Sequence, residues 1–142
     1  MKSINILLVE DNLGDIELTR ESLRRGRLKN KLTVVEDGEL ALDYLFQRGE
    51  FESVSRPDII LLDLNLPKVS GREVLAAVKA HSDTKDIPII ILSSSHDAKD
   101  IKESYKLHAN CFVTKPVLLN QFIDVIQSVE TFWIDIVKLP AK

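Results

Sequence analysis

The sequence has little of several features that mark specialised proteins. Its single cysteine, Cys111, rules out a disulfide within the chain and therefore a secreted scaffold held together by disulfides. Its apolar runs are only as long as a β-strand, too short to cross a bilayer or to serve as a cleavable signal sequence. We therefore expect a cytoplasmic protein that makes no use of a membrane.

Excess positive charge and glycine-rich motifs are also absent. The 142 residues include 19 Lys and Arg against 22 Asp and Glu, and this balance argues against a nucleic-acid-binding protein. The five glycines form neither a G-x-G-x-x-G nor a G-x-x-x-x-G-K-[ST] pattern, and no G-x-S-x-G elbow is present. Nucleotide-binding loops and serine hydrolases are thus disfavoured, and the length fits one domain.

The chain does contain short apolar runs that alternate with segments of helical periodicity. Continuous apolar runs are typical of parallel strands that are buried on both faces. The pattern predicts an α/β fold: a doubly wound, flavodoxin-like parallel sheet of five strands in the order 2-1-3-4-5, with helices on both faces. The five runs are Ile4–Val9, Leu32–Val35, Ile59–Leu62, Ile87–Leu92 and Cys111–Thr114.

The helical segments can be placed between these runs by their apolar stripes and caps. Asn12 is expected to cap a first helix and Ser70 a third, whereas Gly49–Arg56 is expected to be a surface loop. A fourth helix through Ile101 is predicted to be more exposed, and a fifth begins near Leu119. The expected buried stripe of the first helix consists of Leu13, Ile16, Thr19 and Leu23.

Polar residues that suit phosphoryl chemistry follow four of the runs. In open α/β sheets the ligand site lies outside the carboxyl ends of the strands, so these residues are expected to converge there. Several carboxylates favour a hard divalent cation, and a lysine can pair with an anion. The set indicates Mg²⁺-dependent phosphoryl transfer, and its members are Glu10, Asp11, Asp63, Ser93 and Lys115.

The ordered motifs resemble those of the receiver domains of two-component response regulators. They are Leu7–Asn12, Leu61–Pro67 followed by Gly71, Ile91–Ser94 and Lys115–Pro116. The resemblance covers about residues 4–130. It implies a receiver domain over residues 1–130 and a helix extension and tail over residues 131–142, with no output domain.

The resemblance also implies a role for each residue of the phosphorylation site. Asp63 is the expected phosphoacceptor, attacking the phosphorus of a phosphohistidine on a sensor histidine kinase. Asp11 and Asp63 are expected to bind Mg²⁺ directly, Glu10 through water, and Asn65 through its backbone carbonyl. Lys115 is expected to contact the phosphoryl group.

Further roles implied by the resemblance concern the conformational switch. The Ser93 hydroxyl is expected to turn toward the phosphoryl group, while the Phe112 ring changes rotamer, in place of a more common tyrosine. The signal then appears on the face of helix 4, strand 5 and helix 5. Asn65 and Ser95 occupy positions that tune hydrolysis of the aspartyl phosphate.

A narrower resemblance links the chain to stand-alone receivers of cyanobacterial-type phytochrome histidine kinases. It depends on the tract Ala41–Phe46, on Arg56–Asp58 after a long loop, and on the pair Phe132 and Trp133. A phytochrome-type kinase is therefore a candidate partner. A downstream protein, either a target or a relay histidine protein, is expected as a second partner.

The apolar tail around Phe132 and Trp133 has two interpretations. These side chains either extend the last helix over the core or form an interface, and we predict a symmetric homodimer through the last helix and its extension.

Other functions were weighed against a signalling module. An Mg²⁺-dependent phosphatase acting on a diffusible substrate would use the same acids, but Gly49–Arg56 is too short to form a cap over a pocket. An unphosphorylated scaffold would not need the complete set of site residues. His108 and Cys111 supply only two of the four ligands of a structural zinc site. We therefore predict a protein that is not an enzyme beyond its own phosphorylation and dephosphorylation.

Overall fold

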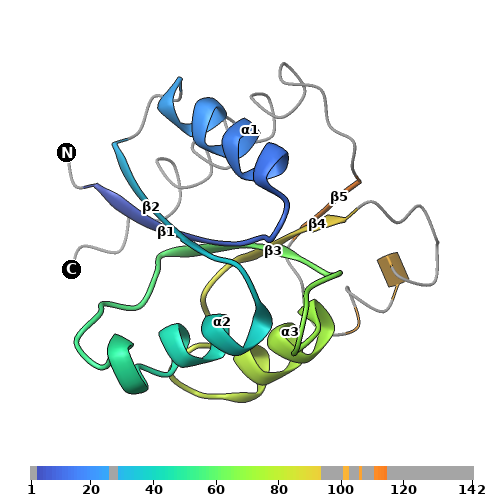
Figure 1. Ribbon diagram of the computed structural model, residues 1–142. Helices are drawn as coiled ribbons and strands as arrows, with labels where there is room; N and C mark the ends of the chain where they lie inside the picture. Colours follow the sequence, from blue (N-terminus) through green and yellow to red (C-terminus); the bar gives the residue numbers. More distant parts are fainter. Residues whose placement is uncertain (1–2, 26–28, 94–100, 103–105, 107–110, 115–142) are drawn as a thin grey trace.

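The computed structural model describes residues 3–25, 29–93, 101–102, 106 and 111–114. Its five strands form one parallel sheet in the order β2-β1-β3-β4-β5, which confirms the predicted topology. In Figure 1, α1 covers one face of this sheet, and α2 and α3 cover the other. The strands are β1 (Ile4–Val9), β2 (Asn30–Val35), β3 (Ile59–Asp63), β4 (Ile89–Ser93) and β5 (Cys111–Thr114).

The strand boundaries differ slightly from the apolar runs. β4 begins at Ile89 instead of Ile87. The Ile87 amide donates to the carbonyl of Thr84 at 3.0 Å, in the preceding turn, and Pro88 has no amide hydrogen to contribute to a ladder. Pro88 instead accepts a hydrogen bond through its carbonyl from the Ile60 amide at 3.0 Å.

The core lies on both faces of the three central strands. Alternate residues of β1 and β3 point to opposite faces, as the period of a strand requires. Leu7 and Ile60 belong to the cluster beneath α2 and α3, whereas Leu8 and Leu61 belong to the cluster beneath α1. The central strands are thereby buried on both faces, and the residues that follow them are held in fixed positions.

Three α-helices lie entirely within the described part of the chain, and each begins at a side chain that accepts an amide hydrogen bond. Asn12 caps α1 (Leu13–Arg24) and Ser70 caps α3 (Gly71–Ala80), as predicted, while Asp37 caps α2 (Gly38–Leu45). Ile101, Lys102 and Lys106 are helical, but most of the predicted fourth helix and all of the fifth helix and tail lie outside the described residues.

One member of the predicted α1 stripe is misplaced. Leu13 is 72% exposed, whereas the buried residues are Ile16, Thr19, Ser22 and Leu23. At about 100° per residue, Leu13 lies roughly 110° from the centre of the stripe that these four residues form. The prediction for Leu13 is therefore wrong, and α1 presents a leucine to solvent two residues after Asp11.

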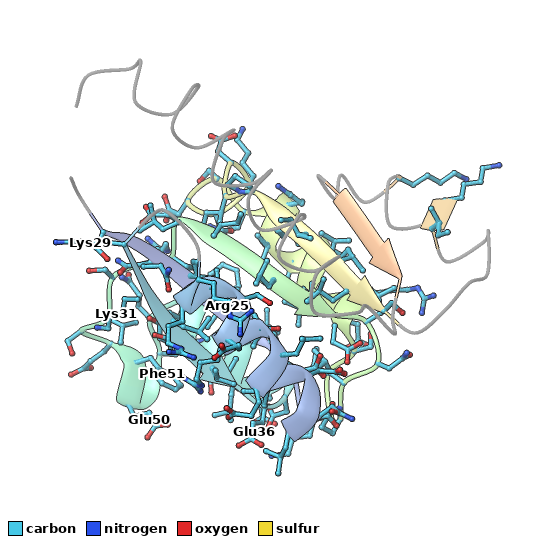
Figure 2. The ribbon with its side chains drawn as sticks, turned by 90° about the horizontal axis from the view of Figure 1, so that it is seen from above. Arg25, Lys29, Lys31, Glu36, Glu50 and Phe51 are labelled. Carbon is cyan, nitrogen blue, oxygen red and sulfur yellow. The ribbon has the colours of Figure 1, made fainter. Side chains whose placement is uncertain are left out.

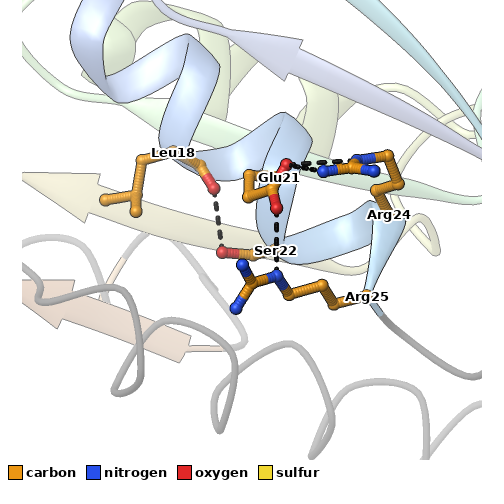
Figure 3. A network of polar contacts seen from close by, with 5 residues as sticks. All are labelled: Leu18, Glu21, Ser22, Arg24 and Arg25. Carbon is orange, nitrogen blue, oxygen red and sulfur yellow. Dashed lines mark hydrogen bonds and ion pairs between the residues drawn. The ribbon is translucent and has the colours of Figure 1, made fainter.

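The end of α1 is held by a small polar network (Figure 3). Glu21 accepts hydrogen bonds from Arg24 and Arg25, and the second bond measures 3.0 Å. The hydrogen bond from Arg24 lowers the pKa of the Glu21 carboxyl, and Glu21 in turn raises the pKa of Arg24. Ser22 donates its hydroxyl to the Leu18 carbonyl at 2.8 Å, so this buried polar side chain is satisfied within the helix.

β2 forms an edge of the sheet (Figure 2). Lys29 precedes this strand, Lys31 lies within it, and both are exposed. Charged side chains on an edge strand oppose pairing with the edge of another sheet. A dimer made through this edge is therefore disfavoured.

The segment 49–56 contains more order than the predicted loop. A short 3₁₀ helix, η1 (Gly49–Phe51), places the Phe51 ring 5.2 Å from the ring of Tyr44, centroid to centroid. Arg56 donates to the carbonyl of Leu45 at 2.9 Å, at the end of α2. These contacts fasten the segment to α2.

Candidate functional site

The first acids of the site directly follow β1. Glu10 is almost fully buried, and its amide continues the ladder by donating to the Val35 carbonyl at 3.0 Å. Its Oε2 accepts a hydrogen bond from the Asn12 amide at 3.3 Å. Asp11, by contrast, is exposed. Two consecutive acids thus differ in access to water: one is enclosed and held by the backbone, and the other is open to an incoming group.

Asp63 is the last residue of β3. It is 6% exposed and lies between Leu62 and Leu64, which are also buried. Its Oδ1 accepts a hydrogen bond from the Asn65 amide at 3.0 Å, which fixes the orientation of the carboxylate. Burial of a carboxylate costs free energy that hydrogen bonds or a nearby cation must offset, so a buried acid at a strand end is a candidate functional group.

The sheet brings these acids together. Val9 pairs with Leu62, so the residues that follow them, Glu10 and Asp63, come from neighbouring strands at the same edge. Glu10, Asp11 and Asp63 each offer a carboxylate oxygen, and these oxygens lie within 4.8 Å of one another. The predicted convergence of the three acids is confirmed by this geometry.

The dimensions of the cluster suit a small divalent cation. Mg²⁺–oxygen distances of about 2.0–2.1 Å place two ligands on opposite sides of the ion about 4.1 Å apart. A spread of 4.8 Å needs only a small contraction, or one water between an acid and the ion, to reach that geometry. Carboxylate oxygens are also the preferred ligands of this ion, so the acidic cluster can hold a divalent metal.

Ser93 lies one strand further along the same edge. It ends β4, is fully buried, and follows Leu92, which pairs with Asp63. Ser93 itself pairs with Thr114, the last residue of β5. A hydroxyl next to the acidic cluster therefore has a fixed place in the sheet.

The loop from Leu64 to Ser70 completes the described part of the site. The Gly71 amide donates to the Leu64 carbonyl at 3.0 Å. A Cβ at Gly71 would lie 2.2 Å from the Asp63 carbonyl oxygen, so the start of α3 approaches the end of β3 more closely than any side chain allows. Asn65 is exposed on this loop.

Several predicted residues lie outside the described part of the chain or have side chains outside it. Those outside are Lys115, Ser95, Phe132, Trp133 and, from the weaker zinc hypothesis, His108, while Phe112 and Cys111 lie in β5 with undescribed side chains.

Sequence reasoning missed the residues that support the loop. No prediction from the sequence included the three residues that join the loop from Leu64 to Ser70 to the start of α2, namely Asp37, Gly38 and Lys68. A glycine directly after a capping residue was the available signal, because glycine is disfavoured in helices unless something approaches it closely.

Known proteins match the chain along most of its length. The model of the response regulator receiver domain matches residues 6–127. The chain is 46% identical over 136 residues to response regulator Rcp1 of Synechocystis sp., covering 96% of this chain and 92% of that protein.

In the described part of the chain, no helix has the length and apolar character needed to cross a membrane.

Solved structures show the same similarity. The phosphorylated cyanobacterial phytochrome response regulator RcpA superposes with a TM-score of 0.88 at 45% identity, covering 99% of this chain and 100% of that one. The Mn²⁺-bound form of response regulator Rcp1 gives a TM-score of 0.86 at 45% identity, with coverages of 97% and 99%. A similar protein thus binds a divalent cation, and another is known in a phosphorylated form.

Proposed function

The chain belongs to the response regulator receiver domain family, and we propose that it accepts a phosphoryl group on Asp63 from a sensor histidine kinase, with Mg²⁺ as its cofactor. The observation that carries the proposal is the cluster of Glu10, Asp11 and Asp63, whose oxygens lie within 4.8 Å of one another. The buried position of Asp63 at a strand end supports its role as the acceptor.

In the proposed reaction, a carboxylate oxygen of Asp63 attacks the phosphorus of the phosphohistidine. The new bond joins this oxygen to phosphorus, the phosphorus–nitrogen bond breaks, and the imidazole nitrogen leaves with the electron pair. The Asn65 amide holds Oδ1 of Asp63 at 3.0 Å and so orients the carboxylate for attack. Bound Mg²⁺ would neutralise phosphoryl charge as a Lewis acid.

The remaining site residues have proposed roles in binding and hydrolysis. Asp11 and Asp63 would bind the cation directly, Glu10 would bind it through water, and Asn65 would offer its backbone carbonyl. The enclosed position of Glu10 and the exposed position of Asp11 support this difference. Lys115 contacts the phosphoryl group. The product is hydrolysed without turnover of an external substrate, at a rate tuned by Asn65 and Ser95.

The proposed output is a conformational change. Ser93 is buried beside the acceptor strand, so a turn of its hydroxyl toward a phosphoryl oxygen would alter packing in the interior. In the proposed switch, the ring of Phe112 in β5, the strand next to β4, then changes rotamer. The signal is then presented on the face of helix 4, strand 5 and helix 5 to a downstream protein or a relay histidine protein.

We propose a phytochrome-type histidine kinase as the partner. Similarity to RcpA over the whole of that chain supports both this partner and a receiver domain formed by residues 1–130. The single cysteine supports the cytoplasm as the compartment.

Incubation with acetyl phosphate tests the proposed function. In Mg²⁺ we expect intact-mass spectrometry to detect one added phosphoryl group, labile to base, on a large fraction of the protein. Removal of divalent cations with EDTA should reduce this labelling to background, because the acids then repel the donor. Labelling that is absent, or equal in EDTA, would contradict the proposal.

We also propose that residues 131–142 mediate a homodimer through Phe132 and Trp133. The apolar composition of this segment supports an interface, and two-fold dimers are the commonest assemblies. Sedimentation velocity should find a dimer for the full chain and a monomer for a Phe132→Ser/Trp133→Ser variant. A monomeric full chain, both with and without beryllofluoride, would rule out this interface.

A further inference from the structure

The loop from Leu64 to Ser70 lies against the start of α2. A Cβ added at Gly38 would lie 1.9 Å from the carbonyl oxygen of Val69. Because that oxygen belongs to the backbone, only a movement of the loop or of α2 could make room for a side chain. Val69 and Leu66 also pack against the core cluster beneath α2 and α3. The tip of the loop is therefore seated on α2.

A second contact joins the same two segments. Lys68 adopts a φ of 65°, in the left-handed region, and its Nζ lies 3.8 Å from Oδ2 of Asp37. The Asp37 side chain is 13% exposed, and its Oδ1 accepts the Leu40 amide at 2.7 Å as the cap of α2. One carboxylate thus contacts both the helix start and the loop.

The base of the loop is fixed to the functional site. The Asn65 amide donates to Asp63 at 3.0 Å, and the Gly71 amide donates to the Leu64 carbonyl at 3.0 Å. The base of the loop is consequently held by hydrogen bonds at the end of β3, and its tip is supported by α2. A displacement of Val69 would act on the segment that carries Asn65.

We propose that Asp37 and Gly38 are positioning residues for the divalent cation. By fixing the loop, they hold the backbone carbonyl of Asn65 where it can join Glu10, Asp11 and Asp63 as a ligand. This inference rests on the proposed function, because it takes Asn65 as a ligand of the cation. Neither positioning residue needs to touch the cation, since groups that orient ligands act on affinity through those ligands.

Gly38→Ala tests this role. The added methyl group should displace Val69 and weaken Mg²⁺ binding about tenfold, the lower end of the effect that outer-shell substitutions typically have on metal affinity. Isothermal titration calorimetry without a phosphodonor measures the affinity directly. In acetyl phosphate assays, the Mg²⁺ concentration for half-maximal rate should rise by the same factor, while the rate at saturating Mg²⁺ changes much less.

Gly49→Ala is the matched control. Gly49 has a φ of 58° and no neighbouring atom within 4 Å of an added Cβ, so this variant strains the backbone without touching the loop. It should keep the wild-type Mg²⁺ affinity. Equal affinities of Gly38→Ala and wild type, or a parallel loss in Gly49→Ala, would overturn the inference.

Lys68→Met provides a milder variant if Gly38→Ala does not fold. The Lys68 side chain is 62% exposed, so removing this ion pair should weaken Mg²⁺ binding only about twofold, because pairs that are open to water contribute little. An unchanged affinity would count against the role of Asp37. A wild-type protein that binds no Mg²⁺ would instead overturn the proposed function, before any variant is compared.

Discussion

Replacing Asp63 with Asn should give a folded protein that gains no phosphoryl group from acetyl phosphate in Mg²⁺. The asparagine side chain retains an oxygen that can accept a hydrogen bond from the Asn65 backbone amide, which lies 3.0 Å from Asp63 Oδ1 in the wild type. The side-chain amide of asparagine, however, is not a nucleophile for phosphorus. Intact-mass spectrometry should show labelling at background, whereas the wild type is labelled. This is the largest effect on function that a single substitution in the chain is expected to have.

Stability provides a second measurement on the same variant. Asp63 shares a small volume with Glu10 and Asp11, and two like charges within 4.8 Å repel by about 1 kcal/mol even in water. Without metal, Asp63→Asn should therefore unfold at a higher urea concentration than the wild type. Added Mg²⁺ should stabilise the wild type more than the variant, because a bound ligand stabilises the state that binds it.

Asp58→Asn is a suitable control for both measurements. Asp58 precedes β3 at its opposite end, where Oδ2 accepts the Asn5 amide at 2.8 Å. The same chemical change there should leave phosphorylation intact. Phosphorylation of Asp63→Asn to the wild-type extent would show that another residue is the acceptor.

Gly71→Ala should destabilise the protein by about 3 kcal/mol, the upper end of the usual cost of overpacking. The new methyl group would lie 2.2 Å from the Asp63 carbonyl oxygen and 2.5 Å from the Leu64 Cα. Both atoms belong to the backbone of the acceptor strand and its loop, so no rotation of a side chain can relieve the contact. Urea unfolding followed by far-UV circular dichroism measures the change.

Gly14→Ala is the corresponding control in α1. A Cβ there would meet only the Asn12 Oδ1, at 3.3 Å, and the site is exposed. Its free energy of unfolding should change by less than about 1 kcal/mol, since alanine is the better helix former. If Gly71→Ala unfolds at the same urea concentration as Gly14→Ala and the wild type, α3 does not approach Asp63 as closely as described.

Much of the site could be predicted because it follows from the sheet. Runs that are apolar at every position indicate strands buried on both faces, and parallel strands place their carboxyl ends at one edge. Glu10 and Asp63 therefore had to meet once β1 and β3 were neighbours. Asn12 and Ser70 were also correct as caps, because capping depends on residues close in the chain.

What could not be predicted depends on contacts between distant segments. The meeting of Gly38 with Val69 arises from the packing of a loop on a helix, and no periodicity encodes it. The exposure of Leu13 follows from the rotation of α1 on the sheet, which the apolar pattern at a helix end defines poorly. The order in segment 49–56 depends on the rings of Tyr44 and Phe51.

The pairing of β1 with β3 also determines when the acidic cluster can exist during folding. Four elements, α1, β2, α2 and η1, intervene in the chain between these strands, so Glu10 and Asp63 meet only after a long loop has closed. Such closure is entropically costly and slow. A cation held by the three acids has no site in a chain whose central strands have not met. A bound cation would therefore stabilise the native protein and leave the early folding steps, which precede the meeting of these strands, unchanged.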